Sequence, residues 1–432
     1  MRVLLTALTV ATLALLLAST TQEVLAASAP AACIPPYVGG ESDVAWRQAA
    51  EARIERIRKA ELRVVVVDLN GQPVRGATVG VHMKRHAFPF GTAVSASLLT
   101  SPAGEEYREA ILKHFNVAVF ENAFKWPYWE NWGRSKGLAA LAWLEEHDIP
   151  LRGHTLVWPG WQYLPAWVRF LEDDPAALHE AVLEHIREEA GALRGRVIAW
   201  DVLNEPYSNR DLMKILGDEA MVEWFKAARE ADPGAQLFIN DYGILSSGGL
   251  DRKHQDAYFA TIRYLLEQGA PLDAIGMQGH FDSDLTPPER LLEILDRFAV
   301  FDKPIWITEF DVDIEDEELQ AAYLRDFFTA VFSHPAVEGI LMWGFWDGAH
   351  WKQNAPLYRR DWTLKRSGRA WLDLVFGQWW TNEAGTTDAN GTFATRGFLG
   401  DYEVEVSAGG RRETVAVRLP REGATLRVVL DE

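Results

Sequence analysis

The alternation of apolar and polar positions divides most of the chain into short strands and longer helices. Helical periodicity fills the gaps between the apolar runs, and one helix is expected to begin at Asp174-Pro175. A doubly wound open sheet would alternate in the same way, but no Gly-rich phosphate loop follows any strand. The pattern therefore predicts an α/β fold, a (β/α)8 TIM barrel over residues 89–377. Its eight expected strands are 90–94, 116–120, 150–154, 197–203, 236–240, 274–278, 304–308 and 338–342.

The two ends of the chain carry a different pattern, the period-two alternation of β-strands. Residues 41–88 contain β-branched runs on both sides of Asn70-Gly71, which predicts a hairpin. Residues 378–432 offer strands at 402–406, 413–418 and 424–430. Each end holds too few strands to bury a core alone. We expect the two ends to pair into one small accessory β-sandwich, with two separate flaps as the rival arrangement.

Trp379-Trp380 lies where the barrel pattern ends and the C-terminal strands begin. We expect the pair to pack the sandwich onto the barrel. A platform for carbohydrate is the alternative interpretation, because sugars stack on aromatic rings.

The first residues predict export from the cytoplasm. Arg2, an apolar run and the small residues before Ala26 are typical of a cleaved secretory signal over residues 1–26. Residues 27–40, with three prolines, are expected to form a flexible leader. The protein is then secreted, either to the periplasm or outside the cell, with no membrane association after cleavage. A lipid anchor on Cys33 is the alternative.

Charge and composition exclude several classes of partner. The formal net charge is −19, from 43 basic and 62 acidic residues, and such a chain repels nucleic acid. A single cysteine excludes an intramolecular disulfide and a thiolate-rich metal site. No His, Asp or Glu group has the spacing of a catalytic metal site. We therefore expect a monomer that uses neither a cofactor nor a metal.

Polar side chains follow nearly every expected barrel strand, where TIM barrels carry their active sites. Glu205 and Glu309 end the fourth and seventh strands and are expected to face each other across the barrel mouth. Glycoside hydrolysis requires such a pair of carboxyl groups, one protonated and one ionised. From position alone, Asn204 could bind a sugar hydroxyl, while His280 and Asp311 could hold Glu309. The other polar strand-end residues are Glu121, Asn122, Lys125, His154, Asn240, Asp241, Tyr242 and Gln278.

Seven segments resemble glycoside hydrolase family 10, the retaining endo-β-1,4-xylanases: FENAFKW, LRGHTLVW, WDVLNEP, FINDYG, IGMQGHF, WITEFDV and LMWGFWD. The resemblance implies that Glu205 is the general acid/base and Glu309 the nucleophile. It implies that Asn204 contacts the sugar 2-hydroxyl, and that Asp201 and Asp311 support the site. The implied substrate-binding residues are Glu121, Asn122, Lys125, His154, Trp158, Asn204, Tyr242, Gln278, His280, Trp343 and Trp351. The implied substrate is xylan, cut at internal linkages.

One position departs from the family pattern. Where the family usually has a second histidine after HTLVW, this chain has Pro159, followed by Gly160-Trp161-Gln162-Tyr163. Proline offers no side-chain hydrogen bond, so one sugar contact is lost or is supplied by Trp161 or Gln162. Two alternatives therefore remain: the same machinery acting on another β-1,4-glycan, or a carbohydrate-binding protein without turnover.

The chain is rich in tryptophan, with 18 residues. Sugar rings stack on aromatic faces, so we expect the tryptophans in three strand-end loops to line a cleft for a neutral polysaccharide. These are Trp126, Trp129, Trp132, Trp158, Trp161, Trp167, Trp343, Trp346, Trp351 and Trp362.

Overall fold

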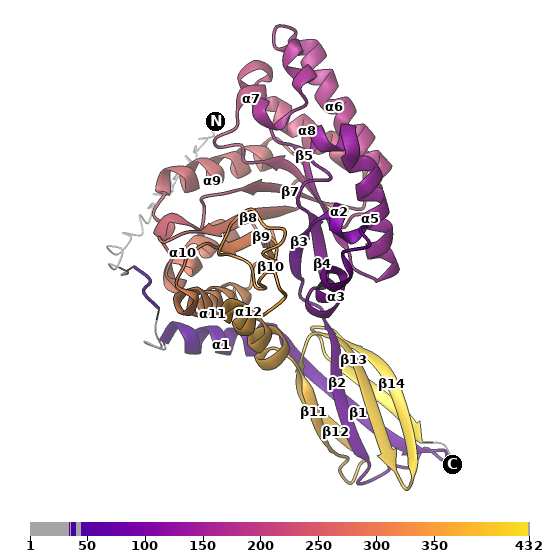
Figure 1. Ribbon diagram of the computed structural model, residues 1–432. Helices are drawn as coiled ribbons and strands as arrows, with labels where there is room; N and C mark the ends of the chain where they lie inside the picture. The colour runs from indigo at the N-terminus through magenta and orange to yellow at the C-terminus, as the bar shows by residue number, and fades with distance from the viewer. Residues whose placement is uncertain (1–33, 35, 40–44, 431–432) are drawn as a thin grey trace, which may run out of the picture. The chain divides into compact units, whose positions relative to one another are not determined.

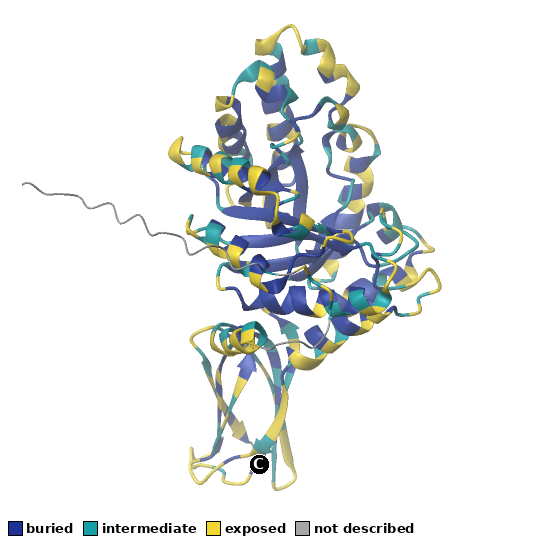
Figure 2. Ribbon diagram, turned by 90° about the vertical axis from the view of Figure 1, so that its left-hand side faces the viewer, coloured by how far each residue is buried: buried dark blue, intermediate teal, exposed yellow. Residues whose placement is uncertain are grey.

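Eight parallel strands close into a barrel, in the order β10-β3-β4-β5-β6-β7-β8-β9 (Figure 1). They are β3 (Phe90–Val94), β4 (Val117–Phe120), β5 (Leu151–Val157), β6 (Ala199–Asn204), β7 (Gln236–Asp241), β8 (Ala274–Phe281), β9 (Ile305–Val312) and β10 (Val337–Met342). Nearly all their residues are buried, because one face packs in the barrel and the other meets helices (Figure 2). The predicted barrel is confirmed. The computed structural model describes residues 34, 36–39 and 45–430.

Five strands run further than their apolar patterns predicted, and three of them, β5, β8 and β9, do so by three residues or more. β8 ends at Phe281 and β9 at Val312. The carboxyl ends of β8 and β9 therefore include Gln278, His280, Glu309 and Asp311, which lie in the sheet and not in loops beyond it. Strand pairing fixes their backbones relative to one another, since Gln278 pairs with Glu309 and His280 with Asp311.

Helices connect the strands and cover the outside of the barrel. The α-helices are α1 (Ala45–Ile57), α2 (Ala96–Leu99), α3 (Glu105–His114), α4 (Trp126–Tyr128), α5 (Arg134–Glu146), α6 (Pro175–Ala192), α7 (Asp211–Leu216), α8 (Glu219–Ala231), α9 (Arg252–Glu267), α10 (Pro288–Ala299), α11 (Glu317–Ser333) and α12 (Arg366–Leu372). The 3-10 helices are η2 (Trp161–Tyr163), η3 (Ala166–Leu171) and η4 (Ser247–Gly249), and the π-helical segments are η1 (Trp129–Gly133) and η5 (Asp373–Gln378). As the sequence predicts, α6 begins at Pro175, capped by Asp174, whose carboxylate accepts a hydrogen bond from Ala177 N.

Strands from both ends of the chain form one accessory sandwich of two sheets. The first sheet has the order β12-β1-β15 and the second β11-β2-β13-β14. The strands are β1 (Lys59–Asp68), β2 (Thr78–His86), β11 (Asn382–Thr386), β12 (Thr392–Phe398), β13 (Gly400–Ala408), β14 (Arg411–Leu419) and β15 (Ala424–Leu430). Each N-terminal strand has C-terminal strands on both sides (Figure 1). The joint sandwich is confirmed, and the arrangement of two separate flaps is excluded.

The hairpin predicted at Asn70-Gly71 is wrong. A tight turn does form there, with Gly71 N donating to Asp68 O and Gly71 at a φ of 75°. However, β1 and β2 belong to different sheets. Pairing stops at an isolated bridge between Val67 and Pro73, because beyond it Val66 N donates to Gly391 O and β1 pairs with β12 instead. The chain then crosses to the second sheet.

The segment before β1 differs from the expected all-β pattern. Helix α1 opens it and packs against α11, where Arg47 pairs with Asp326. Tyr37, from the segment expected to be a flexible leader, also donates a hydrogen bond to Asp326 Oδ2 (3.0 Å) and meets Tyr323 edge-on. The expected signal peptide, residues 1–26, lies outside the described residues.

Aromatic rings join the sandwich to the barrel. Trp379 is buried and stacks against Phe90, the first residue of β3, and against Phe332 of α11. Its carbonyl is hydrogen-bonded to the His86 ring at the end of β2. Trp380 is half-buried, with its ring beside those of His86 and Phe376. Trp379 therefore packs the sandwich onto the barrel, as the sequence predicted.

Candidate active site

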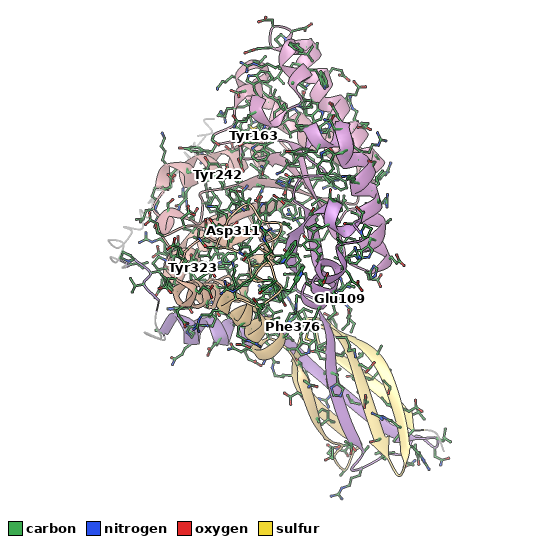
Figure 3. The ribbon with its side chains drawn as sticks, in the orientation of Figure 1. Glu109, Tyr163, Tyr242, Asp311, Tyr323 and Phe376 are labelled. Atoms are coloured by element: carbon green, nitrogen blue, oxygen red, sulfur yellow. The ribbon has the colours of Figure 1, made fainter. Side chains whose placement is uncertain are left out.

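A cleft of about 890 Å³ opens at the carboxyl ends of the barrel strands. Residues on or after seven strands, β4 to β10, line it. It contains all the predicted catalytic and substrate-binding residues except Asn122. Asn122 lies next to the cleft, where its Oδ1 accepts a hydrogen bond from Lys125 Nζ (3.1 Å). Figure 3 labels Tyr163, Tyr242 and Asp311 at this end of the barrel, and Phe376 near the sandwich.

Glu205 is the first residue after β6, and the turn there places it in the left-handed region, with a φ of 53°. Non-glycine residues rarely adopt this conformation, and it is often found at functional sites. The Glu205 N–H donates to Asn240 O (2.7 Å), which fixes the turn. The carboxyl accepts hydrogen bonds from Gln278 Nε2 and from Trp158 Nε1, both at 3.1 Å.

Glu205 has the pKa of a group that can donate a proton near neutral pH. Burial raises its pKa to about 7, and the nearby negative charges of Glu309 and Asp241 add to the rise. The hydrogen bond from Gln278 and the charge of His280 oppose it. The protonated carboxyl is therefore well populated at pH 7.

Glu309 lies within β9 and has a different environment. Its Oε1 accepts a hydrogen bond from Asn240 Nδ2 and its Oε2 meets His280 Nε2, both at 3.0 Å. Burial alone would lower the pKa of His280, but the Asp311 and Glu309 carboxylates outweigh it and raise the pKa to about 10. His280 is then an imidazolium at neutral pH, with Nδ1 2.9 Å from Asp311 Oδ2. Each oxygen of the Glu309 carboxyl group is thus held by one partner, the Asn240 amide or the His280 ring.

A second group of contacting polar side chains, Arg152, Asp201 and His154, lies on another side of the cleft. Asp201 in β6 accepts hydrogen bonds from Arg152 (2.8 Å) and contacts His154 Nδ1 (2.9 Å), and all three side chains are buried. Burial opposes ionisation of Asp201, but the charge of Arg152 prevails and lowers its pKa. His154 is thereby held with its ring edge-on to Trp343 across the barrel mouth. Asp201 and Asp311, the two residues expected to support the site, contact the cleft residues His154 and His280 respectively.

Lys125 lines the cleft together with Glu205 and Glu309. Burial lowers the pKa of its ammonium group, while the carboxylates of Glu309, Glu121 and Glu205 oppose that shift. Its Nζ also lies 5.3 Å from the centre of the Trp158 ring. Lys125 thus offers a hydrogen-bond donor to a ligand beside Trp158.

The structure gives roles in the site to two residues, Asn240 and Asn209, to which the sequence analysis assigned none. Asn240 bridges the two glutamate environments: its Nδ2 donates to Glu309 and to Asn204 Oδ1, and its Oδ1 accepts from Thr308. Asn209 lies four residues after Glu205 and donates to Glu205 Oε2 (3.3 Å). Position at a strand end marked Asn240, but no sequence pattern distinguishes Asn209.

The loop after Pro159 has a packing role around Asn209. Gly160 has no side chain there, and a Cβ would lie 2.7 Å from Asn209 Oδ1. Gln162 Nε2 approaches the same Oδ1 (3.4 Å). Tyr163 stacks on Trp158 with ring centres 3.5 Å apart. Gln162 and Tyr163 both line the cleft, so Gln162 lies where it could replace the missing histidine contact.

Fewer tryptophans line the cleft than the ten that the sequence analysis expected. Only Trp158, Trp343 and Trp351 of that set line the cleft in the described part of the chain. Trp126 and Trp129 are buried in the core, with Trp126 stacked on His185. Trp346 and Trp362 stack on each other. Their positions in loops predicted contacts with a ligand, but several of these tryptophans pack against other residues of the protein instead.

Among residues 45–430 and the few described before them, no group of three or more His, Cys, Asp or Glu side chains could hold a metal ion. No helix in that same part of the chain is long and apolar enough to cross a membrane.

Comparisons with known proteins relate the chain to one family. Residues 80–369 match the model of glycosyl hydrolase family 10. The chain is 35% identical over 392 residues to the anti-sigma-I factor RsgI6 of Acetivibrio thermocellus, covering 89% of this chain and 50% of that protein. It is 33% identical over 360 residues to endo-1,4-beta-xylanase 1 of Arabidopsis thaliana, covering 82% of this chain and 37% of the relative. The chain thus spans half or less of these two relatives.

A solved structure extends the likeness to three dimensions. Xylanase 10B from Thermotoga petrophila RKU-1, in complex with xylobiose, superposes with a TM-score of 0.61 at 28% identity, covering 67% of this chain and 94% of that one. With the family model matched over most of the barrel, the chain belongs to glycosyl hydrolase family 10.

Proposed function

We propose that the protein is a retaining endo-β-1,4-glycosidase that cuts xylan, with Glu205 as general acid/base and Glu309 as nucleophile. One observation carries the proposal: two glutamates share a cleft in unlike environments. Glu205 has a pKa of about 7, whereas Glu309 contacts the His280 imidazolium and the Asn240 amide. Carboxyl groups whose environments separate their protonation states divide into an acid and an anion.

The reaction follows in two displacements. In the first, the Glu309 carboxylate attacks the anomeric carbon while Glu205 gives its proton to the departing glycosidic oxygen, leaving a glycosyl ester on Glu309. In the second, the Glu205 carboxylate takes a proton from water, which attacks the same carbon and releases Glu309. Glu205 regains its proton in this step, so both residues return to their starting states.

The surroundings of the pair support a sugar substrate. Asn204 is fully buried, and its Nδ2 has no hydrogen-bond partner among the described residues. That amide is available to a hydroxyl of the sugar under attack. Trp343 and Trp351 offer aromatic faces on the wall opposite Glu205's loop, and Trp351 is held by a hydrogen bond to Asp311 (2.8 Å).

Xylan is favoured by the relatives, several of which are named endo-1,4-beta-xylanases, and by the neighbour that binds xylobiose. Two observations keep alternatives in view. Pro159 removes a contact typical of the family, which favours a test on other β-1,4-glycans. The relative RsgI6 is named an anti-sigma factor, which favours a test for binding without turnover.

The deciding experiment measures reducing ends released from purified xylan and from cellulose-type polymers, by the wild type and by Glu309→Ala. We expect internal cuts in xylan by the wild type alone, with a preference over cello-oligosaccharides above about tenfold in kcat/KM, or ~1.4 kcal/mol. Binding without product after long incubation would identify a carbohydrate-binding protein without turnover. Equal activity of wild type and variant would remove Glu309 from the mechanism.

Azide separates the roles of the two glutamates. In Glu309→Ala, azide can occupy the vacated position and attack directly, giving a glycosyl azide of inverted configuration. In Glu205→Ala, with an activated aryl glycoside, azide should intercept the glycosyl ester and give the retained configuration. The opposite assignment of products would exchange the two roles.

We also propose that residues 1–26 direct export and that the released protein is a monomer in the periplasm or outside the cell. Fractionation of expressing cells, with N-terminal sequencing of the product, tests the first statement. Light scattering at several concentrations tests the second. A product that keeps Arg2 and stays in the cytoplasm contradicts the proposed export.

A further inference from the structure

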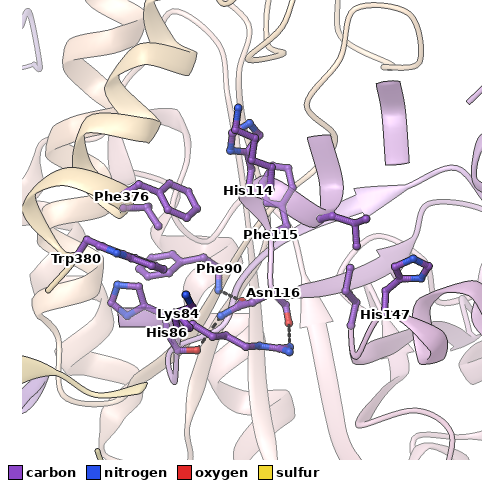
Figure 4. A pocket seen from close by; sticks show the side chains of 14 residues that line it. Lys84, His86, Phe90, His114, Phe115, Asn116, His147, Phe376 and Trp380 are labelled. Carbon is purple, nitrogen blue, oxygen red and sulfur yellow. Dashed lines mark hydrogen bonds between the residues drawn. The ribbon is translucent and has the colours of Figure 1, made fainter. Parts of the chain in front are cut away.

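A second cavity lies at the opposite end of the barrel from the cleft. It has a volume of about 150 Å³ and is bounded by the amino ends of β3, β4 and β5, by β2 of the sandwich and by η5 (Figure 4). Asn116 forms part of its floor: Oδ1 accepts from Phe90 N, and Nδ2 donates to His86 O and Phe88 O. Its backbone carbonyl accepts a hydrogen bond from Arg85 Nη2 (2.9 Å), so the floor also positions the Arg85 guanidinium.

One wall of the cavity is a continuous run of aromatic rings. Trp380 lies 5.3 Å from Phe376, and Phe376 lies 5.9 Å from His114, measured between ring centres. Figure 4 shows His147 across Asn116 from this wall. Trp380 and Phe376 are half-buried, so part of each ring stays open to a ligand. A half-exposed aromatic wall can stack against the C–H face of a sugar ring.

The charge of the cavity is opposite to that of the protein. Its lining includes Lys84, Arg85 and Lys113 but no carboxylate, although the whole chain has a net charge of −19. Lys84 pairs with Glu403 on the neighbouring strand. Within the described residues, neither Arg85 nor Lys113 has a salt-bridge partner. Burial lowers the pKa of His86 and of His114 to about 4, so the positive charge comes from the lysines and the arginine.

We propose that this cavity binds a single uronic acid group carried by a glycan, with the sugar ring against Trp380 and its carboxylate between Lys113 and Arg85. The cavity volume of about 150 Å³ favours a single sugar unit over a longer oligosaccharide, because pockets for larger molecules are typically ~300–1,000 Å³. The aromatic wall favours a ring over a bare anion such as phosphate, and the cations favour an acidic sugar over a neutral one.

The site would give the sandwich a role in substrate capture. Lys84 and Arg85 come from β2, whereas Lys113 and His147 come from the barrel. An acidic branch held at this junction tethers the polymer while another part of it enters the cleft. The proposal rests on the proposed function to the extent that it takes a polysaccharide as the partner.

The test uses binding in a background where hydrolysis is removed, Glu309→Ala in the full chain. Electrophoresis through gels containing glucuronic-acid-substituted xylan, or unsubstituted xylan, measures retardation by each polymer. Lys113→Glu reverses one charge at the mouth, and Trp380→Ala removes the ring. The matched control is Lys226→Glu, an exposed lysine on α8. Thermal melts check that each variant stays folded.

The proposal expects Lys113→Glu and Trp380→Ala each to weaken binding to the substituted xylan at least threefold, with Lys226→Glu unchanged and with unsubstituted xylan bound equally by all. Free glucuronate should compete, and inorganic phosphate should not. Equal loss for the two lysine variants, equal loss on both polymers, or competition by phosphate as strong as by glucuronate would each overturn it.

Activity of the wild type on short unsubstituted xylo-oligosaccharides separates the two proposals. Selective binding without any cleavage removes the proposed function and leaves the uronate site. Cleavage with unselective binding does the reverse.

Discussion

The two ends of the barrel bury side chains for different purposes. At the carboxyl ends of the strands, Glu205, Glu309 and Asn240 are polar groups held by hydrogen bonds, and the backbone at Glu205 adopts a strained turn. At the amino ends, Trp379 and Phe90 stack with the sandwich behind them. Groups arranged for chemistry often lower stability, whereas apolar packing raises it. Substitutions at the first end should therefore mainly change activity, and those at the second mainly change stability.

The largest expected effect is at Glu309. Replacing it with alanine should lower kcat on xylan by at least ~10⁴-fold, since the carboxylate proposed to form the glycosyl ester is removed. Steady-state kinetics with purified variant measures this. The melting temperature should fall less than in the Trp379 variant below. A large loss of stability with retained activity would reverse the comparison.

Glu205→Gln is expected to lower kcat/KM on xylan about 10²–10⁴-fold, because a glutamine cannot donate the proton. In the wild type, the raised pKa of Glu205 means that the proton is present below pH 7. Activity should then fall as the pH rises through about 7. A pH profile with xylan checks this limb. An activated aryl glycoside has a leaving group that needs no acid, so the rate of glycosyl-ester formation from it should not fall as the pH rises through about 7. If that rate fell as it does with xylan, the alkaline limb would belong to a group other than Glu205.

Trp379→Ala probes the packed end. Removing this buried ring should destabilise the protein by about 3–5 kcal/mol, because Phe90 and Phe332 lose their stacking partner. Chemical denaturation measures the change. At 25 °C, kcat on short oligosaccharides should stay within twofold of the wild type. If kcat fell with stability unaffected, the junction would be linked to the cleft and the two ends would not be independent.

Much of the barrel was predictable because its strands are buried on both faces and stand out as short apolar runs. The same logic placed Glu205, Glu309 and His280 at strand ends. Strand pairing was harder: Asn70-Gly71 makes a local turn, but β1 takes β12 as its neighbour and β2 joins another sheet. Local sequence determines a turn, whereas the partner of a strand depends on segments more than 300 residues away, as for β1 and β12.

Side-chain destinations were the least predictable part of the site. Trp126 and Trp351 both follow barrel strands, yet the first is buried in the core and the second is 54% exposed. Sequence position cannot separate them, because the outcome depends on which rings the loop folds against, here His185 for Trp126. Asn209 is the opposite case, a residue of no recognisable pattern that reaches Glu205.

The smallest expected effect tests that contact. Asn209→Ala removes a donor to Glu205 Oε2, and a lost hydrogen bond of about 1 kcal/mol corresponds to roughly a fivefold lower kcat/KM. The donor favours the ionised carboxyl, so its loss should raise the pKa of Glu205 and move the alkaline limb to higher pH. KM should change less than kcat. A purely structural role would lower stability without moving the limb.

Gly160→Ala is the matched probe of the same contact. Gly160 has a φ of −103°, which alanine adopts freely, so the only cost is the added Cβ 2.7 Å from Asn209 Oδ1. It should displace the amide and reproduce the shift of the pH limb. In the Asn209→Ala background, where that clash is absent, the glycine substitution should add little. Contacting residues that act through one interaction are non-additive in this way. Fully additive losses would mean that Gly160 affects the cleft by another route and that the Pro159 loop does not position Asn209.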